Sequence, residues 1–251
     1  MGQNTKIIAV VGKGGVGKTA LAAALVRSLV ENRPGSRILA IDADPAVGLA
    51  TALQVQVKET LDDIRQEITK EVGTDLKDVQ DILSEARFRL LDMMEEKRDF
   101  AFVAIGRPES SGCYCAINSY LRDTITVLAE QFDYVVIDGE AGIEQVNRRV
   151  MEKVSHLLLV SDQSRKGIQV IRTIQGVAKD LVQYERLGVV INRVPVGGIR
   201  IPEPVEHAET IYITEDHSQM MNDIEGKSVF ELPEDSALIT GAEEILRKLD
   251  V

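Results

Sequence analysis

Short apolar runs alternate with longer segments of helical periodicity along most of this chain. The apolar runs predict strands at residues 6–11, 37–41, 100–105, 134–138, 157–160, 187–192 and 229–233. The segments between them predict helices at 18–31, 117–130, 167–181 and 242–249. This alternation is typical of a mostly parallel central sheet with helices on both faces. We therefore expect an α/β fold in which residues 1–251 form a single domain.

A charged segment at about residues 57–98 departs from this alternation. Leu61, Ile64 and Ile68 recur at helical spacing, as do four later positions, Val79, Ile82, Phe88 and Leu91. We expect a helical insertion packed on the edge of the sheet, in which Gly73 separates two helices. The alternative interpretation is a docking surface for a client protein.

Residues 194–226 carry the weakest pattern, because three prolines and several glycines interrupt it. We expect an irregular excursion here, before a last strand at 229–233. His207 and His217 lie in this excursion, and we expect both to be surface residues and not metal ligands.

A glycine-rich loop follows the first predicted strand and precedes the first predicted helix. Its sequence matches G-x-x-x-x-G-K-[ST], and the flanking strand and helix are the context in which this motif binds phosphate. Glycines let backbone N–H groups turn toward an anion, and the helix start adds its positive dipole end. Lys18 is expected to reach the β- and γ-phosphates and the Thr19 hydroxyl to hold Mg²⁺. We assign nucleotide binding to the loop and the start of the helix: Gly12, Gly14, Gly15, Val16, Gly17, Lys18, Thr19 and Ala20.

Polar residues follow three of the predicted strands. Asp42 and Asp44 follow the second strand, and carboxyl ends of parallel strands are where α/β sheets bind ligands. Asp138 ends an apolar strand, as the magnesium-linked aspartate of a phosphate-loop enzyme does. Gly142 lies in a flexible segment after it that is able to sense a γ-phosphate through backbone N–H groups. Asn192 ends a later strand, and its amide could read a base edge.

Both cysteines of the chain, Cys113 and Cys115, lie in the segment at about 106–118. Extended backbone would place both thiols on one face, which supplies half of a tetrahedral thiolate site. A disulfide between them would be strained. A two-fold dimer would complete four sulfurs. The alternative is a pair of semi-buried structural cysteines.

The charge and hydropathy of the chain bear on which classes of partner it can have. The formal net charge of −11 opposes binding to nucleic acid. No apolar run approaches the length that spans a bilayer, and the N-terminus has no signal-peptide pattern. We expect a cytoplasmic protein with neither nucleic acid nor membrane as its partner.

A second lysine, Lys13, follows the first glycine of the loop, and this K-G-G-x-G-K-T form is the deviant Walker A signature. It resembles the family of nitrogenase iron protein, MinD, ParA and the arsenite and tail-anchored-protein targeting ATPases. The matching positions are Gly12–Thr19, Asp42–Pro45, Asp138–Gly142, Asn192 and Pro233. The resemblance implies an ATPase that sandwiches ATP and Mg²⁺ in a homodimer.

The resemblance also implies roles for single residues. Lys13 would contact the phosphates of the opposing subunit, and Asp44 would position or activate the attacking water, so that the catalytic residues are Lys13, Lys18 and Asp44. Magnesium would be held, directly or through water, by Thr19, Asp44 and Asp138. Further nucleotide contacts are implied at Asp138, Gly142, Asn192, Arg193 and Pro233, with Asn192 against the adenine.

Within this family, residues 112–118 and 141–144 look like one branch, the CooC-type nickel-insertion ATPases that mature carbon monoxide dehydrogenase. A similar relative matures acetyl-CoA synthase. In that branch the Cys-x-Cys pairs of two subunits bind one metal ion. The resemblance implies that Cys113 and Cys115 hold Ni²⁺, or Zn²⁺ as a substitute, and that the client is the apo form of a nickel enzyme.

Two other functions stay open at the level of sequence. One is a dimerisation switch of the MinD or ParA kind, without metal, although residues 243–251 are too short and acidic to hold a bilayer well. The other is a reductase resembling nitrogenase iron protein. Its cluster cysteines lie far apart in sequence, whereas this chain has only the neighbouring pair.

Overall fold

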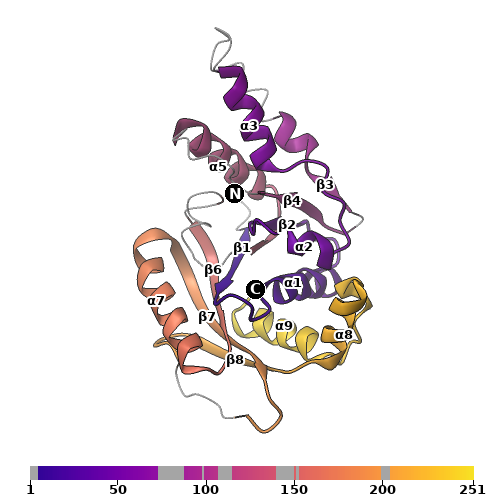
Figure 1. The fold of residues 1–251 in the computed structure, drawn as a ribbon, viewed down its shortest axis with the longest axis vertical. Helices are drawn as coiled ribbons and strands as arrows, with labels where there is room; N and C mark the ends of the chain where they lie inside the picture. Colours follow the sequence, from indigo (N-terminus) through magenta and orange to yellow (C-terminus); the bar gives the residue numbers. More distant parts are fainter. Residues whose placement is uncertain are drawn as a thin grey trace.

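The computed structural model describes residues 5–72, 88–97, 99–106, 115–139, 150, 153–198 and 204–251. Within these residues eight strands form one sheet in the order β3-β4-β2-β5-β1-β6-β7-β8 (Figure 1). The strands are β1 Lys6–Gly12, β2 Ile38–Asp42, β3 Glu95–Glu96, β4 Ala101–Ala104, β5 Tyr134–Asp138, β6 Lys153–Ser161, β7 Gln183–Val194 and β8 Glu209–Thr214. Neighbouring strands are parallel except β3, which pairs antiparallel with β4.

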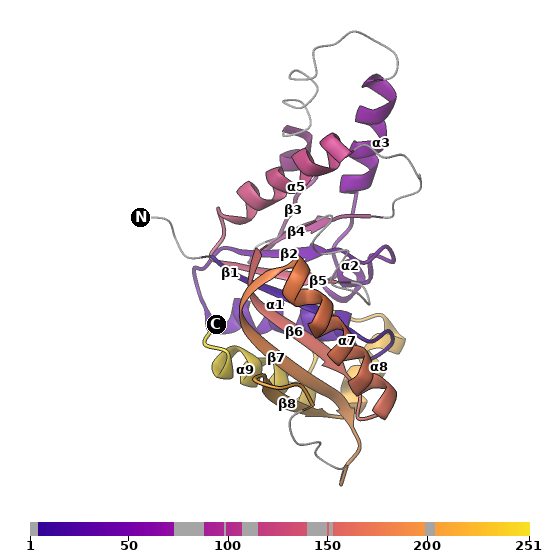
Figure 2. The same ribbon diagram turned by 90° about the vertical axis from the view of Figure 1, so that its left-hand side faces the viewer.

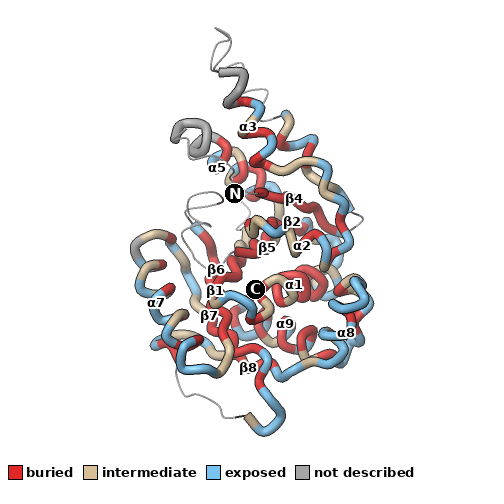
Figure 3. The backbone as a smooth tube through the Cα atoms, viewed as in Figure 1, coloured by how far each residue is buried: buried red, intermediate tan, exposed pale blue. Residues whose placement is uncertain are grey.

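Helices cover both faces of this sheet (Figure 2). They are α1 Lys18–Asn32, α2 Gly48–Ala52, α3 Leu61–Val72, α5 Cys115–Ala129, α7 Arg165–Leu181, α8 His217–Glu225 and α9 Ala237–Lys248, with a 3₁₀ turn η1 at Val229–Glu231. Successive residues of a strand point to opposite faces, so each central strand feeds two apolar layers. Ile8 of β1 packs in the layer with α1 and α9, and Ala9 packs in the layer with α3, α5 and α7. The predicted α/β class with a mostly parallel sheet is confirmed, and the central strands are buried along most of their length (Figure 3).

Parallel pairing brings the ends of distant strands to one edge of the sheet. Asp42 at the end of β2 lies opposite Asp138 at the end of β5, and Asp138 lies opposite Val10 of β1. On the other side of β1, Gly12 lies opposite Val160 of β6. The phosphate-loop motif and the strand-end aspartates therefore meet, although up to 126 positions separate them in sequence.

The structure describes residues 57–72 and 88–97 of the segment in which a helical insertion is predicted. Leu61, Ile64 and Ile68 are buried along α3 as predicted. Phe88 and Leu91 were expected to pack inward, but they are exposed, and Leu90 is buried in their place. The chain is helical at 88–92. Arg89 there forms ion pairs with Glu59 and with Glu67 of α3, which turns Leu90 inward and the opposite side of this helical turn toward solvent. Gly73, Val79 and Ile82 lie outside the described residues.

The prediction of a last strand at 229–233 is wrong. Residues Val229–Glu231 form η1, because Ser228 and Glu231 make a reciprocal capping box that starts a helical turn. Arg27 of α1 donates to the carbonyls of Val229 at 2.9 Å and Leu232 at 2.7 Å and holds this turn against the helix.

The last strand lies instead within the predicted excursion at 194–226. It is β8, where Ile211 and Ile213 are buried and alternate with less buried neighbours. The helix α8 follows it, so this segment is more regular than predicted. His207 and His217 are exposed, as expected. In the described parts of the chain, no helix is both long enough and apolar enough to cross a membrane.

Candidate nucleotide site

The phosphate loop is held against β6 by its backbone. Gly12 has φ 147°, and a Cβ there would lie 2.0 Å from the carbonyl oxygen of Val160. The next amide, that of Lys13, donates to the same carbonyl at 3.1 Å. Only glycine allows this close approach, so the spacing of the motif fixes where the loop leaves the sheet.

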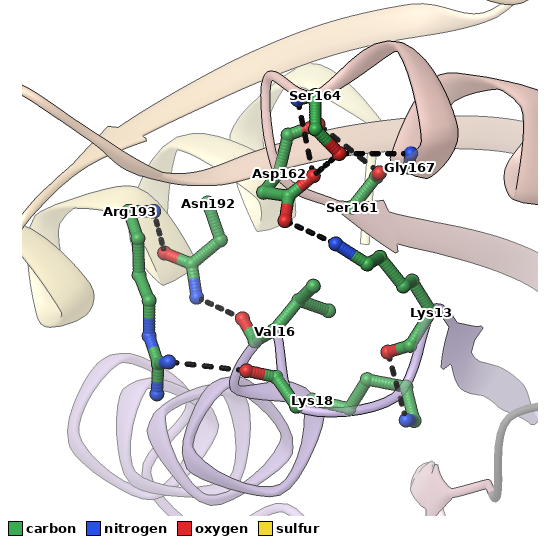
Figure 4. A network of polar contacts seen from close by, with 10 residues as sticks. Lys13, Val16, Lys18, Ser161, Asp162, Ser164, Gly167, Asn192 and Arg193 are labelled. Atoms are coloured by element: carbon green, nitrogen blue, oxygen red, sulfur yellow. Dashed lines mark hydrogen bonds and ion pairs between the residues drawn. The ribbon is translucent and has the colours of Figure 1, made fainter.

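The loop leads into the start of α1. The N-cap is Gly17 at φ 88°, which gives no side-chain cap, and no acidic residue lies in the first turn. The N-cap residue therefore occupies none of the first N–H groups of the helix, which point at the loop, and this arrangement binds phosphate. The Lys18 side chain is buried and its Nζ lies 3.3 Å from the carbonyl oxygen of Lys13, across the loop (Figure 4).

Lys13 is held within its own chain. Its Nζ forms an ion pair with Asp162, which follows β6 and also accepts hydrogen bonds from Ser164 (Figure 4). Burial opposes ionisation of Asp162, but the bonds from Lys13 and Ser164 outweigh it and hold the pKa of this carboxyl below its usual value. Sequence reasoning missed Asp162. Its signal was the one shared by Asp42 and Asp138, a carboxylate directly after or at the end of an apolar strand.

Asn192 and Arg193 clamp the loop from the end of β7. Asn192 Nδ2 donates to the carbonyl of Val16 at 2.8 Å, and its Oδ1 accepts from the backbone N–H of Arg193 at 2.9 Å. The Arg193 guanidinium donates to the carbonyl of Gly15 at 3.0 Å (Figure 4). In this structure both residues thus support the loop backbone, and an adenine contact by Asn192 stays a prediction.

Two carboxylates lie buried behind the loop, and they differ in their partners. Asp42 accepts backbone hydrogen bonds from Leu49 at 2.8 Å and Asp44 at 3.2 Å, yet burial still raises its pKa to about 6. Asp138 is buried, and neither of its oxygens has a hydrogen-bond partner among the described residues. Burial raises the pKa of Asp138 to about 7, although the nearby Thr19 hydroxyl acts in the opposite direction without meeting hydrogen-bond geometry.

A buried carboxylate without partners beside a phosphate loop suits a cation. Removing charge from water is costly unless a counter-charge is supplied, and carboxylate and hydroxyl oxygens are ligands that Mg²⁺ accepts. Asp138 and Thr19 therefore fit the magnesium role predicted for them. Gly48, the first residue of α2, stands where a Cβ would lie 3.3 Å from Thr19 Cγ2, so the chain after β2 packs closely on this residue.

Asp44 lies in the turn between β2 and α2 and is partly exposed. Its Oδ1 accepts from the backbone N–H of Ala46 at 2.9 Å, which fixes the turn. Ala20 is in the first turn of α1, whereas Pro233 is exposed after η1. Cys113 and Gly142 lie outside the described residues, and so does the side chain of Cys115, the first residue of α5. The described residues contain no group of three or more His, Cys, Asp or Glu that could hold a metal ion.

The geometry is that of a phosphate-loop nucleotide site, and comparison with known proteins agrees. Residues 5–186 match the AAA domain family. The chain belongs to this family of MinD/ParA-type P-loop ATPases. An uncharacterized ATP-binding protein of Methanocaldococcus jannaschii is 34% identical over 97% of this chain and 98% of its own length. The carbon monoxide dehydrogenase accessory protein CooC of Rhodospirillum rubrum is 32% identical over 69% of each chain.

Solved structures of MinD/ParA-type ATPases share the fold. The septum site-determining protein MinD of Pyrococcus horikoshii, complexed with Mg-ADP, superposes with a TM-score of 0.69 at 21% identity, covering 98% of this chain and 96% of MinD. Proteins of this family form dimers and complexes, such as the MinC:MinD complex of Aquifex aeolicus. The predicted activity of the chain, an ATP-binding ATPase, is confirmed by its family.

Proposed function

We propose that this ATPase is a dimeric metallochaperone that inserts nickel into an enzyme of the carbon monoxide dehydrogenase or acetyl-CoA synthase type. The observation that carries the proposal is the Cys-x-Cys pair, Cys113 and Cys115, in a chain that shares 32% identity with a carbon monoxide dehydrogenase accessory protein. Thiolates are soft ligands suited to such a metal.

In the proposed cycle of ATP binding and hydrolysis, the nucleotide is bound by the residues of the site described above. The loop amides and Lys18 bind the phosphates, Thr19 and Asp138 hold Mg²⁺, and Asp44 orients the attacking water. Magnesium supplies charge neutralisation on the phosphates. Lys13 leaves Asp162 and reaches the nucleotide of the second subunit, which makes the closed dimer dependent on ATP.

Nickel is the cargo of this cycle. Cys113 and Cys115 from two subunits supply four thiolates around one ion, and closing or opening the dimer changes their geometry. Four thiolates in tetrahedral geometry favour Zn²⁺, whereas Ni²⁺ accepts a square-planar arrangement. Zinc in a purified sample is therefore consistent with the proposal.

The topology supports a link between the two halves. The chain leaves β4 beside the nucleotide site, where Ile105 N donates to the carbonyl of Asp42 at 2.8 Å. It resumes at Cys115, where α5 begins. The last described residues before the cysteine segment therefore lie at the same sheet edge as the phosphate loop, which is the basis for coupling the two in this proposal.

The proposal is tested by sedimentation of the purified protein with and without Ni²⁺ and a non-hydrolysable ATP analogue, with metal content measured on each peak. We expect a dimer with about one nickel per two chains. The double variant Cys113→Ala/Cys115→Ala should lose the metal and keep ATP binding, and Ser111→Ala in the same segment is the matched control.

Unchanged nickel stoichiometry in the double variant would reject the cysteine site. A nucleotide-driven dimer without any metal would instead favour the MinD/ParA-like switch, which acts on a protein or surface partner.

A further inference from the structure

The helix α8 buries a polar residue and exposes its large apolar residues, which is the reverse of an ordinary surface helix. Its buried residue is polar: Asn222 is 8% exposed and donates to the carbonyl of Ser228 at 3.1 Å. Its large apolar side chains face solvent, with Met220 48%, Met221 38% and Ile224 71% exposed. A surface helix usually buries its apolar stripe against the core. Among the residues that the structure describes, none covers this stripe, and Figure 3 shows α8 largely exposed.

These three side chains share one face. Met220 and Ile224 are four positions apart, and Met221 and Ile224 are three apart, which places them side by side on a helix. Methionine is flexible and polarisable, and it is common where a surface adapts to a partner. A contiguous exposed apolar stripe of this kind typically marks an interaction site.

Carboxylates flank the stripe on both sides. At 3.6 residues per turn, Asp223 borders it on one side and Glu225 on the other. Glu225 is paired with Lys227 at 2.6 Å, and the only Lys or Arg in residues 204–227 is this lysine. Residues 215–225, which are α8 and the turn before it, contain four carboxylates: Glu215, Asp216, Asp223 and Glu225.

This charge decides between occupants. Nucleic acid and anionic lipid headgroups are repelled by an acidic surface. A second copy of α8 would bring like charges together across a two-fold contact. A helix with apolar residues on one face and Lys or Arg beside them satisfies both features of the surface.

We propose that the outer face of α8, formed by Met220, Met221 and Ile224, is a docking site for a basic amphipathic helix of another protein. The site lies near the nucleotide-binding edge of the sheet, because α8 follows the carboxyl end of β8. Gln54, two residues after α2, also donates to the carbonyl of Gly226 at 2.9 Å. It does not depend on the nickel proposal, because it uses no residue of the cysteine segment.

The test uses a fluorescein-labelled peptide of about 18 residues in which leucine and lysine alternate at helical spacing. A scrambled peptide has the same composition without an apolar face. Binding is measured by fluorescence anisotropy on the full-length protein. We expect the ordered peptide to bind at least about tenfold more tightly than the scrambled one, because only it presents an apolar stripe.

The variant Met220→Gln/Ile224→Gln removes the stripe without changing charge. We expect its affinity for the ordered peptide to fall about tenfold or more. Val127→Gln is the matched control, since Val127 is 48% exposed on α5, away from this face. Circular dichroism and ATP binding show that each variant folds.

Three results would overturn the proposal. The first is equal binding of the ordered and scrambled peptides, which would reveal charge attraction alone. The second is unchanged affinity in the double variant. The third is a wild-type protein that self-associates but does not bind the peptide, together with a double variant that no longer self-associates. This result would assign the face to a second copy of the chain.

Discussion

Asp138 shows how one residue reveals the ligand of the site. Its carboxylate is buried, has no hydrogen-bond partner among the described residues, and has a pKa raised to about 7 by burial. An ordinary structural aspartate would bond backbone amides, as Asp42 does with Leu49. Burial of this carboxylate therefore has a cost that a bound cation would offset.

We expect Asp138→Asn to stabilise the nucleotide-free protein and to abolish magnesium-dependent hydrolysis. The gain in free energy of unfolding should be about 2 kcal/mol at pH 8, because a buried charge whose pKa is raised by desolvation is removed. Urea denaturation measures the first effect and phosphate release the second. Asp123→Asn, at an exposed position of α5, should change neither. A destabilised Asp138→Asn protein would show that the carboxylate has a structural partner after all.

Lys13 gives the second prediction at this scale. Its ion pair with Asp162 must break before the lysine can reach a second subunit. We expect Asp162→Ala to lower the protein concentration needed for ATP-dependent dimerisation by about two- to fivefold, the size of a partly exposed ion pair. Sedimentation with a non-hydrolysable ATP analogue measures it.

The control for this prediction is Ser164→Ala, which removes a hydrogen bond to Asp162 but leaves the ion pair. It should dimerise like the wild type. Weaker dimerisation of Asp162→Ala would mean that Asp162 supports the closed dimer and does not restrain Lys13.

At the scale of elements, the phosphate loop depends on its glycines to different degrees. A Cβ at Gly12 would lie 2.0 Å from the Val160 carbonyl oxygen, whereas a Cβ at Gly14 would meet no atom within 4 Å. We expect Gly12→Ala to destabilise the fold by about 2–4 kcal/mol and Gly14→Ala to leave its stability nearly unchanged. Thermal unfolding of the two variants compares them. Equal effects would mean that the loop moves freely away from β6.

The elements could be predicted where local pattern and burial agree. The run Tyr134–Asp138 is apolar and central, and its predicted bounds match β5. The apolar run at 229–233 led to a wrong prediction of a strand. The capping box of Ser228 and Glu231 outweighs the strand preference of Val229 and Phe230. Phe88 misled because its orientation depends on the ion pairs of Arg89 with α3, which no local pattern contains.

The candidate site divides in the same way. The phosphate loop, Asp42 and Asp138 could be predicted, because each lies in or directly after an apolar strand and parallel strands end at one edge. The bond between Asn192 and Val16 joins residues 176 positions apart, and so only the folded chain reveals that Asn192 supports the loop. The partnership of Lys13 with Asp162 escaped prediction for the same reason.

In the whole molecule, the nucleotide site and the contacts that hold the C-terminal segment lie at opposite edges of the sheet. The nucleotide site occupies the carboxyl edge. At the other edge, Lys6 donates to the carbonyl of Asp250 at 2.7 Å and Arg33 to the carbonyl of Val251 at 2.8 Å. The ring of the buried His156 contacts the Leu249 carbonyl at 3.0 Å. These contacts fasten the segment after α9 to β1, α1 and β6, so this edge should govern stability more than nucleotide affinity.

The contribution of the edge that carries His156 to stability can be measured through the titration of this residue. Burial lowers the pKa of this imidazole, although the Leu249 carbonyl opposes the shift. In the unfolded chain histidine titrates near pH 6.5. As pH falls below that value, the unfolded chain takes up a proton that the folded chain resists, so the free energy of unfolding decreases. Above it the ring is neutral in both states, and the contribution is constant.

We therefore expect His156→Gln to remove part of the acid-induced loss of stability. Its free energy of unfolding should fall less than that of the wild type between pH 7 and pH 5, by urea denaturation without nucleotide. The two proteins share every other titrating group, so the difference between their profiles isolates His156. The exposed His207→Gln is the control and should follow the wild type. ATP affinity should stay unchanged in both variants at pH 7.5, because neither residue lies at the carboxyl edge. Parallel pH profiles for wild type and His156→Gln would show that the buried imidazole accepts a proton without cost to this edge.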